Sequence, residues 1–88
     1  MTEQEFREQL RSEGFDQLVL VERAPAGMLD RHRHPFEAKA LVLQGSIEID
    51  CAGERRTYAA GEVFHLPREA EHVERYGRQG VRYLVGRR

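Results

Sequence analysis

The spacing of apolar residues divides the chain into one short helical segment and a series of short strands. Phe6 and Leu10 are four residues apart near the N-terminus, so they share one face of a helix. Thr2 and Glu5 have the three-residue spacing of a capping box, which satisfies free amide groups at a helix start. The pattern therefore predicts one amphipathic helix over residues 3–13.

After the helix, short apolar runs alternate with glycines and prolines, which are typical of turns. The clearest run extends from Ser46 to Cys51, where strict alternation places the apolar residues on one face and Glu48 and Asp50 in water. Many short strands with regular turns indicate a β-sandwich or barrel. The predicted strands cover residues 17–24, 28–34, 37–43, 46–51, 54–59, 62–66, 72–76 and 81–86.

The length of 88 residues suits one small domain. We expect residues 1–15 to supply a helix that packs on a single barrel domain of residues 16–88. Fourteen Lys and Arg against fifteen Asp and Glu give a net charge of −1, which argues against nucleic acid or a membrane surface as a partner. The first residues do not resemble a secretory signal, and one cysteine excludes an internal disulfide framework. We therefore expect a soluble, cytoplasmic protein.

Three of the four histidines have a spacing that suits metal binding. His32 and His34 are two residues apart in a predicted strand, so both project from one face while Arg33 points away. Neutral imidazole suits Zn, Fe, Ni, Cu or Mn, and a site needs further donors. His72, at the start of a later strand, is the candidate third donor, whereas His65 is predicted to face the opposite side. Exposed polar residues at a strand end are the alternative interpretation.

Two stretches of the chain resemble the two signatures of the cupin superfamily. Residues 27–45 hold a glycine, a His-x-His pair, a carboxylate and a closing glycine, and residues 61–72 hold a glycine, a proline and a final histidine. The resemblance covers nearly everything except the helix. It implies an all-β cupin fold, the double-stranded β-helix or jelly-roll-like barrel, with a site in its mouth. It also implies that His32, His34 and His72 bind a metal directly.

One position departs from the family pattern. Counting back from Gly45, cupins usually place a ligating glutamate where this chain has Ala38. Strict alternation from His34 turns Ala38 inward and Glu37 outward. However, Pro35 can mark a β-bulge, and a bulge would shift the register and return Glu37 to the mouth. Both registers remain open at the level of the sequence.

Three side chains are therefore candidates for a fourth ligand or for the pocket wall: Glu37, Glu74 and Tyr76. Glu74 and Tyr76 share the face of His72, and Tyr76 occupies a place where the cupin pattern often has asparagine. The simpler interpretation pairs Glu37 with Lys39 or an arginine at the surface. On that interpretation Glu74 only makes the pocket polar.

The resemblance implies one bound divalent transition-metal ion, with Fe, Mn, Ni and Zn as the candidates. Three neutral imidazoles would leave open coordination positions, so the ion could act as a Lewis acid or, as iron, bind oxygen. We expect a metal-binding cupin that takes a small-molecule ligand. It is either a metal-dependent dioxygenase or isomerase acting on a small polar substrate, or a non-catalytic module that binds a small ligand or stores a metal. Histidines that are only relics are a third hypothesis.

Both faces of the strand that ends at Leu43 are apolar. One face lines the barrel, and the other, with Leu41 and Leu43, needs a cover. The helix has only Phe6 and Leu10 as main apolar contacts, so we expect it to shield part of that face. A small domain buries a limited share of its surface, and twofold pairs are the commonest oligomers. We therefore expect a homodimer with Leu41, Leu43 or both at the interface.

Overall fold

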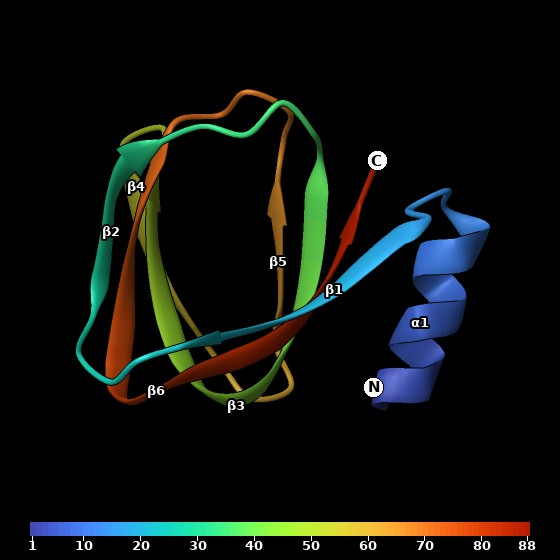
Figure 1. Ribbon diagram of the computed structural model, residues 1–88, viewed down its shortest axis with the longest axis horizontal. Coiled ribbons are helices and arrows are strands. Elements are labelled where there is room, and N and C mark those ends of the chain that lie inside the picture. The colour runs from blue at the N-terminus through green and yellow to red at the C-terminus, as the bar shows by residue number, and fades with distance from the viewer.

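A computed structural model describes residues 1–88 as one helix and six strands (Figure 1). The prediction of an all-β barrel with one short N-terminal helix is confirmed. The elements in chain order are α1 (Glu3–Ser12), β1 (Gln17–Arg23), β2 (Met28–His32), β3 (Ala38–Cys51), β4 (Glu54–Ala59), β5 (Val63–Leu66) and β6 (His72–Arg87).

The helix begins with the predicted capping box. The amide of Glu5 donates to the Thr2 hydroxyl at 3.1 Å, and the amide of Thr2 donates to the Glu5 carboxylate at 2.8 Å. These two bonds satisfy amides that have no partner inside the helix. Phe6 and Leu10 are fully buried on the face that meets the barrel. With ten residues, α1 is neither long nor apolar enough to span a bilayer.

The barrel is built around β3 and β6, which pair antiparallel from Ala38 opposite Arg87 to Cys51 opposite His72. The first half of β3 also pairs with β5 and its second half with β4. In the same way β6 pairs first with β2 and then with β1. One layer of the barrel thus holds β1, β5 and the halves of β3 and β6 that pair with them, and the other layer holds β2, β4 and the remaining halves. The two layers close around one apolar interior (Figure 1). Its members are Val21, Ala38, Ala40, Val42, Ile47, Ile49, Phe64, Leu66, Tyr76, Val81, Tyr83 and Val85.

The predicted breaks in these two strands are wrong. The predicted strands 37–43 and 46–51 are parts of one strand, β3, which begins at Ala38 and bends at Gly45. The predicted strands 72–76 and 81–86 are parts of β6, which bends before Val81. Gly45 and Gly80 have positive φ angles of 73° and 74°, which glycine adopts without strain. A Cβ at Gly45 would lie 2.1 Å from the Gly80 carbonyl oxygen. The bends therefore depend on a close backbone contact, and not on a chain reversal.

A second apolar cluster joins α1 to the outer face of the barrel. It contains Phe6, Leu10, Phe15, Leu41 and Leu84, and Leu43 packs against it while partly buried. Leu41 is only 2% exposed. Since α1 of the same chain covers Leu41, Leu43 is the one of the two predicted interface residues that is left for a partner subunit.

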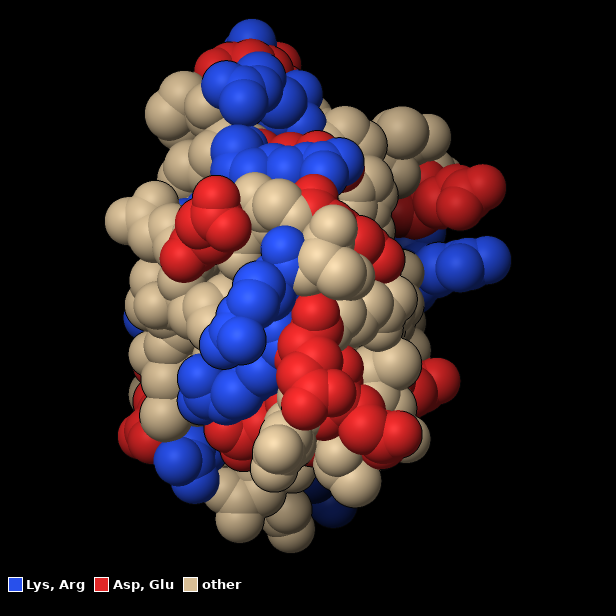
Figure 2. All heavy atoms as spheres, turned by 90° about the vertical axis from the view of Figure 1, so that its right-hand side faces the viewer, with Lys and Arg blue, Asp and Glu red and all other residues tan.

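Acidic and basic side chains intermix on the side of the molecule that carries α1 (Figure 2). Arg7 pairs with Glu3 within the helix at 2.8 Å, and Lys39 of β3 pairs with Glu13 just after it, also at 2.8 Å. Ion pairs at the surface contribute only about 0–1 kcal/mol each, and the Lys39–Glu13 pair is still partly open to solvent. Apolar burial of Phe6 and Leu10 is thus the main force that holds α1 on the barrel.

Substitution of Gly45 tests the close backbone contact. We expect Gly45→Ala to destabilise the fold by about 3 kcal/mol, since it combines left-handed strain with overpacking against Gly80. Gly53 is a matched control, because its φ is 80° but no atom lies within 4 Å of its added Cβ. Gly53→Ala should lose only about 1 kcal/mol. Urea unfolding followed by circular dichroism measures both, and equal losses would contradict this account of the bend.

The homodimer is still a prediction, and Leu43 is the apolar residue left for its interface. Light scattering at micromolar concentration should give about 20 kDa, twice the 10.2 kDa of one chain. Leu43→Lys should lower that mass while leaving the circular dichroism spectrum unchanged. A mass of one chain for the unmodified protein would rule the dimer out.

Candidate metal centre

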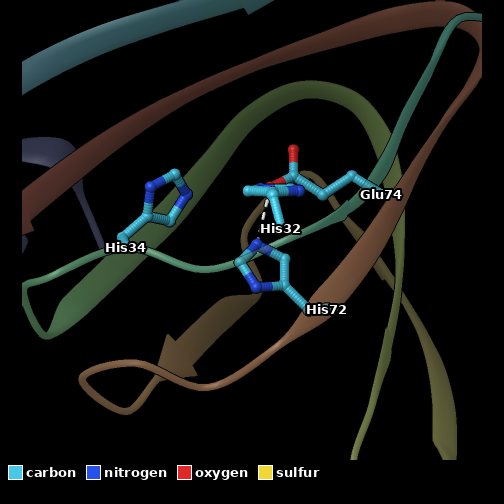
Figure 3. A group of neighbouring side chains, drawn as sticks. All are labelled: His32, His34, His72 and Glu74. Carbon is cyan, nitrogen blue, oxygen red and sulfur yellow. Dashed lines mark hydrogen bonds and ion pairs between the residues drawn. The ribbon is translucent and has the colours of Figure 1, made fainter.

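Four side chains converge where β2 ends and β6 begins (Figure 3). They are His32, His34, His72 and Glu74, and one potential ligand atom from each lies within 4.8 Å of those of the others. His72 and Glu74 are the first and third residues of β6, so alternation turns them to the same face. The structure therefore brings together the three histidines predicted from the sequence and one of the candidate acids.

A β-bulge in β2 turns His32 into this cluster. Leu29 lies opposite Glu74, but His32 lies opposite His72, so the register shifts by one residue between the two pairs. The imidazole centroids of His32 and His72 are 4.2 Å apart. His34 lies beyond the end of β2, and its ring centroid is 4.8 Å from that of His32. The predicted strand 28–34 thus ends two residues early, and His34 reaches the cluster from the following connection.

Backbone hydrogen bonds fix the tautomers of two of the rings. His32 Nδ1 lies 2.7 Å from the Asp30 carbonyl oxygen, and His72 Nδ1 lies 3.0 Å from that of Ala70. Because a carbonyl only accepts, each Nδ1 must carry the hydrogen, and Nε2 of the neutral ring then has a free lone pair. Both Nε2 atoms face Glu74 Oε2, at 3.3 Å from His32 and 2.9 Å from His72.

This arrangement suits a cation. With neutral rings, two nitrogen lone pairs and a carboxylate oxygen point at one another, and these groups repel unless a proton or a metal lies between them. His32 Nε2 is buried and makes no hydrogen bond. A buried polar atom without a partner is costly, so a ligand for this atom is expected. Imidazole and carboxylate donors are those that Zn, Fe, Mn and Ni accept, so the residues present fit a transition metal.

Tyr76 holds the carboxylate from the other side. Its hydroxyl donates to Glu74 Oε1 at 3.0 Å, and both side chains are buried. Burial, and next the nearby Glu74 carboxylate, raise the pKa of Tyr76 to about 12. Tyr76 therefore remains a hydrogen-bond donor at neutral pH and orients Glu74, as partners of ligating carboxylates do.

The cluster sets unequal proton affinities in the metal-free chain. Burial opposes ionisation of Glu74, but hydrogen bonds from His72 and Tyr76 outweigh it and lower the pKa of Glu74. Burial likewise opposes protonation of His72, but the hydrogen bond to Glu74 raises the pKa of His72. Burial and then the charges of His32 and His72 lower the pKa of His34. A proton therefore goes to His72 before His34.

Glu37 lies outside the cluster. Its carboxylate accepts from Arg88 Nε at 2.7 Å and lies 2.5 Å from Nε2 of His65, which is exposed. Ala38 is buried in the barrel interior. The register shift that would bring Glu37 to the mouth does not occur, and the outward alternative, with an arginine partner, is the observed one. The carboxylate that comes nearest the histidines belongs to Glu74 of β6.

A cavity of about 60 Å³ lies beside the cluster. His34 and Glu74 line it, and eight of its twelve lining residues are hydrophobic, Ala38 among them. Arg23 and Arg87 also line it. The sequence analysis missed both arginines, although Arg87 continues the inward alternation of Tyr83 and Val85 along β6, and that alternation could have identified it.

Residues 19–82 match the profile of the family described as the cupin domain. No curated protein matches the chain. Among solved structures, a protein of unknown function from Rhizobium leguminosarum bv. viciae 3841 has a TM-score of 0.75 and 20% identity over 80% of this chain and 66% of its own. A cupin-2 domain protein from Shewanella frigidimarina has a TM-score of 0.68 and 23% identity over 82% of this chain and 70% of its own.

KdgF from a Halomonas species has a TM-score of 0.67 and 23% identity over 81% of this chain and 67% of its own. The chain spans slightly less than two thirds of the first of these proteins. At such identities the likeness shows a shared fold, and the cupin barrel expected from the sequence is confirmed.

Titration of the metal-free chain by NMR tests the description of the cluster. Because Glu74 stabilises the protonated ring, His72 should titrate above the ordinary 6.5, and His34 should titrate below it. In Glu74→Gln the hydrogen bond to a carboxylate is lost while burial persists, so the pKa of His72 should fall below 6.5. A lower pKa for His72 than for His34 in the unmodified chain would contradict this description.

Proposed function

This chain belongs to the cupin family, and we propose that its cluster of His32, His34, His72 and Glu74 binds one divalent transition-metal ion, with Fe, Mn, Ni and Zn as the candidates. The observation that carries the proposal is the buried Nε2 of His32, which has no hydrogen-bond partner and faces the Glu74 carboxylate. The donor set and the backbone bonds that fix the ring tautomers support it.

We further propose that the site acts on a small polar substrate, as a dioxygenase or isomerase would. When bound, the ion supplies a Lewis acid or, as iron, a site for oxygen. The chain provides the rest of the environment. Four donors hold the ion, Tyr76 fixes one of them, and the apolar walls of the adjoining cavity keep bulk water away. The cavity of about 60 Å³ admits only a small ligand.

A non-catalytic binding module is the second candidate, and one observation favours it. Apart from the cluster residues, the titratable groups that line the cavity are Tyr83, Arg23 and Arg87. Burial raises the pKa of Tyr83 well above its ordinary value, so it stays protonated, as do the arginines. None of them is a ready proton acceptor.

Assays with small hydroxy and oxo acids separate the two candidates. Oxygen consumption or product formation would establish an enzyme, whereas tight binding of such an acid without turnover would establish the module.

Metal analysis tests the proposed centre. Protein purified without chelator or nickel resin should carry one ion per chain. We expect His72→Ala to weaken metal binding by about 100-fold or more, since even loss of a partner of a ligand weakens it 10–100-fold. Affinity should also fall steeply as the pH drops through about 6.5, because protonated imidazole cannot ligate.

His65→Ala is the matched control, since His65 is an exposed histidine of the same chain outside the cluster. Its metal content and affinity should equal those of the unmodified protein. An unchanged metal content in a variant with alanine at residues 32, 34 and 72 would refute the proposed centre.

A further inference from the structure

Two arginines line the cavity beside the cluster without a carboxylate partner. Arg23 ends β1, and Arg87 ends β6. Neither takes part in any ion pair within 4.0 Å of a carboxylate. Arg23 donates to the backbone carbonyl of Glu22 at 3.3 Å and lies near the Tyr76 hydroxyl, and neither of these groups is charged. Other arginines also lack an acidic partner, but only these two line the cavity beside the cluster.

Arg87 is the more constrained of the two. Its Nε is buried and has no hydrogen-bond partner. Its guanidinium lies over the ring of Phe36, 4.5 Å from the centroid, which holds the group in place without satisfying its N–H donors. A buried N–H of a charged group that lacks an acceptor is costly. An acceptor from outside the chain would remove that cost.

The charge of the cavity also indicates an anionic ligand. Two guanidinium groups and one carboxylate, that of Glu74, line it, which gives a net charge of +1 with the histidine neutral. The Glu74 carboxylate already accepts a hydrogen bond from Tyr76. A divalent ion in the cluster would raise the charge to +3. A cavity of this charge with mostly apolar walls favours an organic anion.

Building on the proposed metal centre, we propose that this cavity binds a small carboxylic acid whose carboxylate is held by Arg87, with Arg23 as a second cation at the edge. A guanidinium presents a planar fork of donors that matches a carboxylate. The apolar walls, which include Val21, Leu29 and Val85, suit a carbon skeleton better than they suit inorganic phosphate. With about 10–15 Å³ of such space per water as a guide, the cavity takes about four to six non-hydrogen atoms, which is an acid of about two or three carbon atoms.

Calorimetric titration of the full chain with pyruvate tests this inference. Metal content is measured first, and each protein is titrated both as loaded with Zn²⁺ and after treatment with chelator. We expect Arg87→Gln to weaken pyruvate binding at least about tenfold, or about 1.4 kcal/mol, without changing the metal content. Arg87→Lys keeps the charge but loses the planar fork of donors, so its loss of pyruvate affinity should be smaller than that of Arg87→Gln. If Arg87→Gln does not fold, Arg87→Lys provides the test.

Arg82→Gln is the matched control. Arg82 belongs to the same strand, but it is exposed and its Nε lies 3.5 Å from Glu22 on the outer surface. Pyruvate should bind this variant as it binds the unmodified protein. The neutral analogue pyruvamide should bind the unmodified protein at least about tenfold more weakly than pyruvate, because it has no charge to pair with Arg87.

The two proposals fail in different ways. A chain that takes up no metal overturns the metal centre alone, since the dependence of pyruvate binding on Arg87 is also read in the chelator-treated protein. Equal pyruvate affinity in Arg87→Gln and the unmodified protein overturns the carboxylate site. Equal binding of pyruvamide, no pyruvate binding in either state, or tighter binding of inorganic phosphate than of pyruvate would overturn it as well.

Discussion

The antiparallel pairing of β3 with β6 is the contact on which the rest of the structure depends. Every other strand joins the barrel through one of these two. The pair bends where Gly45 and Gly80 approach each other, and the bend lets each strand serve both layers. As a result, Glu74 and Arg87 line one cavity although they lie near opposite ends of β6. A straight pair of this length would hold them far apart.

The same pairing explains why a polar cluster is tolerated inside a small barrel. His72 and Glu74 are almost wholly buried, and burial of such groups is costly unless each polar atom has a partner. Ala70, Tyr76 and the two residues themselves supply most of the partners. The atom left without one is Nε2 of His32, which the bulge in β2 brings to the cluster. The chain thus places a buried imidazole nitrogen that has no hydrogen-bond partner where a metal would satisfy it.

Local patterns predicted much of this arrangement. The capping box of α1 and the shared face of His72 and Glu74 follow from spacings of two to three residues, and such spacings are visible in a sequence. The choice between Ala38 and Glu37 as the inward residue stayed open, because a bulge can reverse it. The bulge that directs His32 and the bends in β3 and β6 depend on contacts between distant segments. The sequence analysis therefore predicted an unbroken strand at the bulge and chain breaks at the two bends. The cover that α1 gives to Leu41 also depends on tertiary packing, which helix periodicity alone does not reveal.

The central claim is that one ion sits among three imidazoles and the Glu74 carboxylate. A crystal structure of metal-loaded protein, with anomalous scattering recorded at the absorption edge of the metal, tests it most directly. The account predicts one strong anomalous peak, about 2.0–2.2 Å from a nitrogen of each of His32, His34 and His72 and from a Glu74 oxygen. A peak at His65 and Glu37, or no peak among the three histidines, would contradict the account.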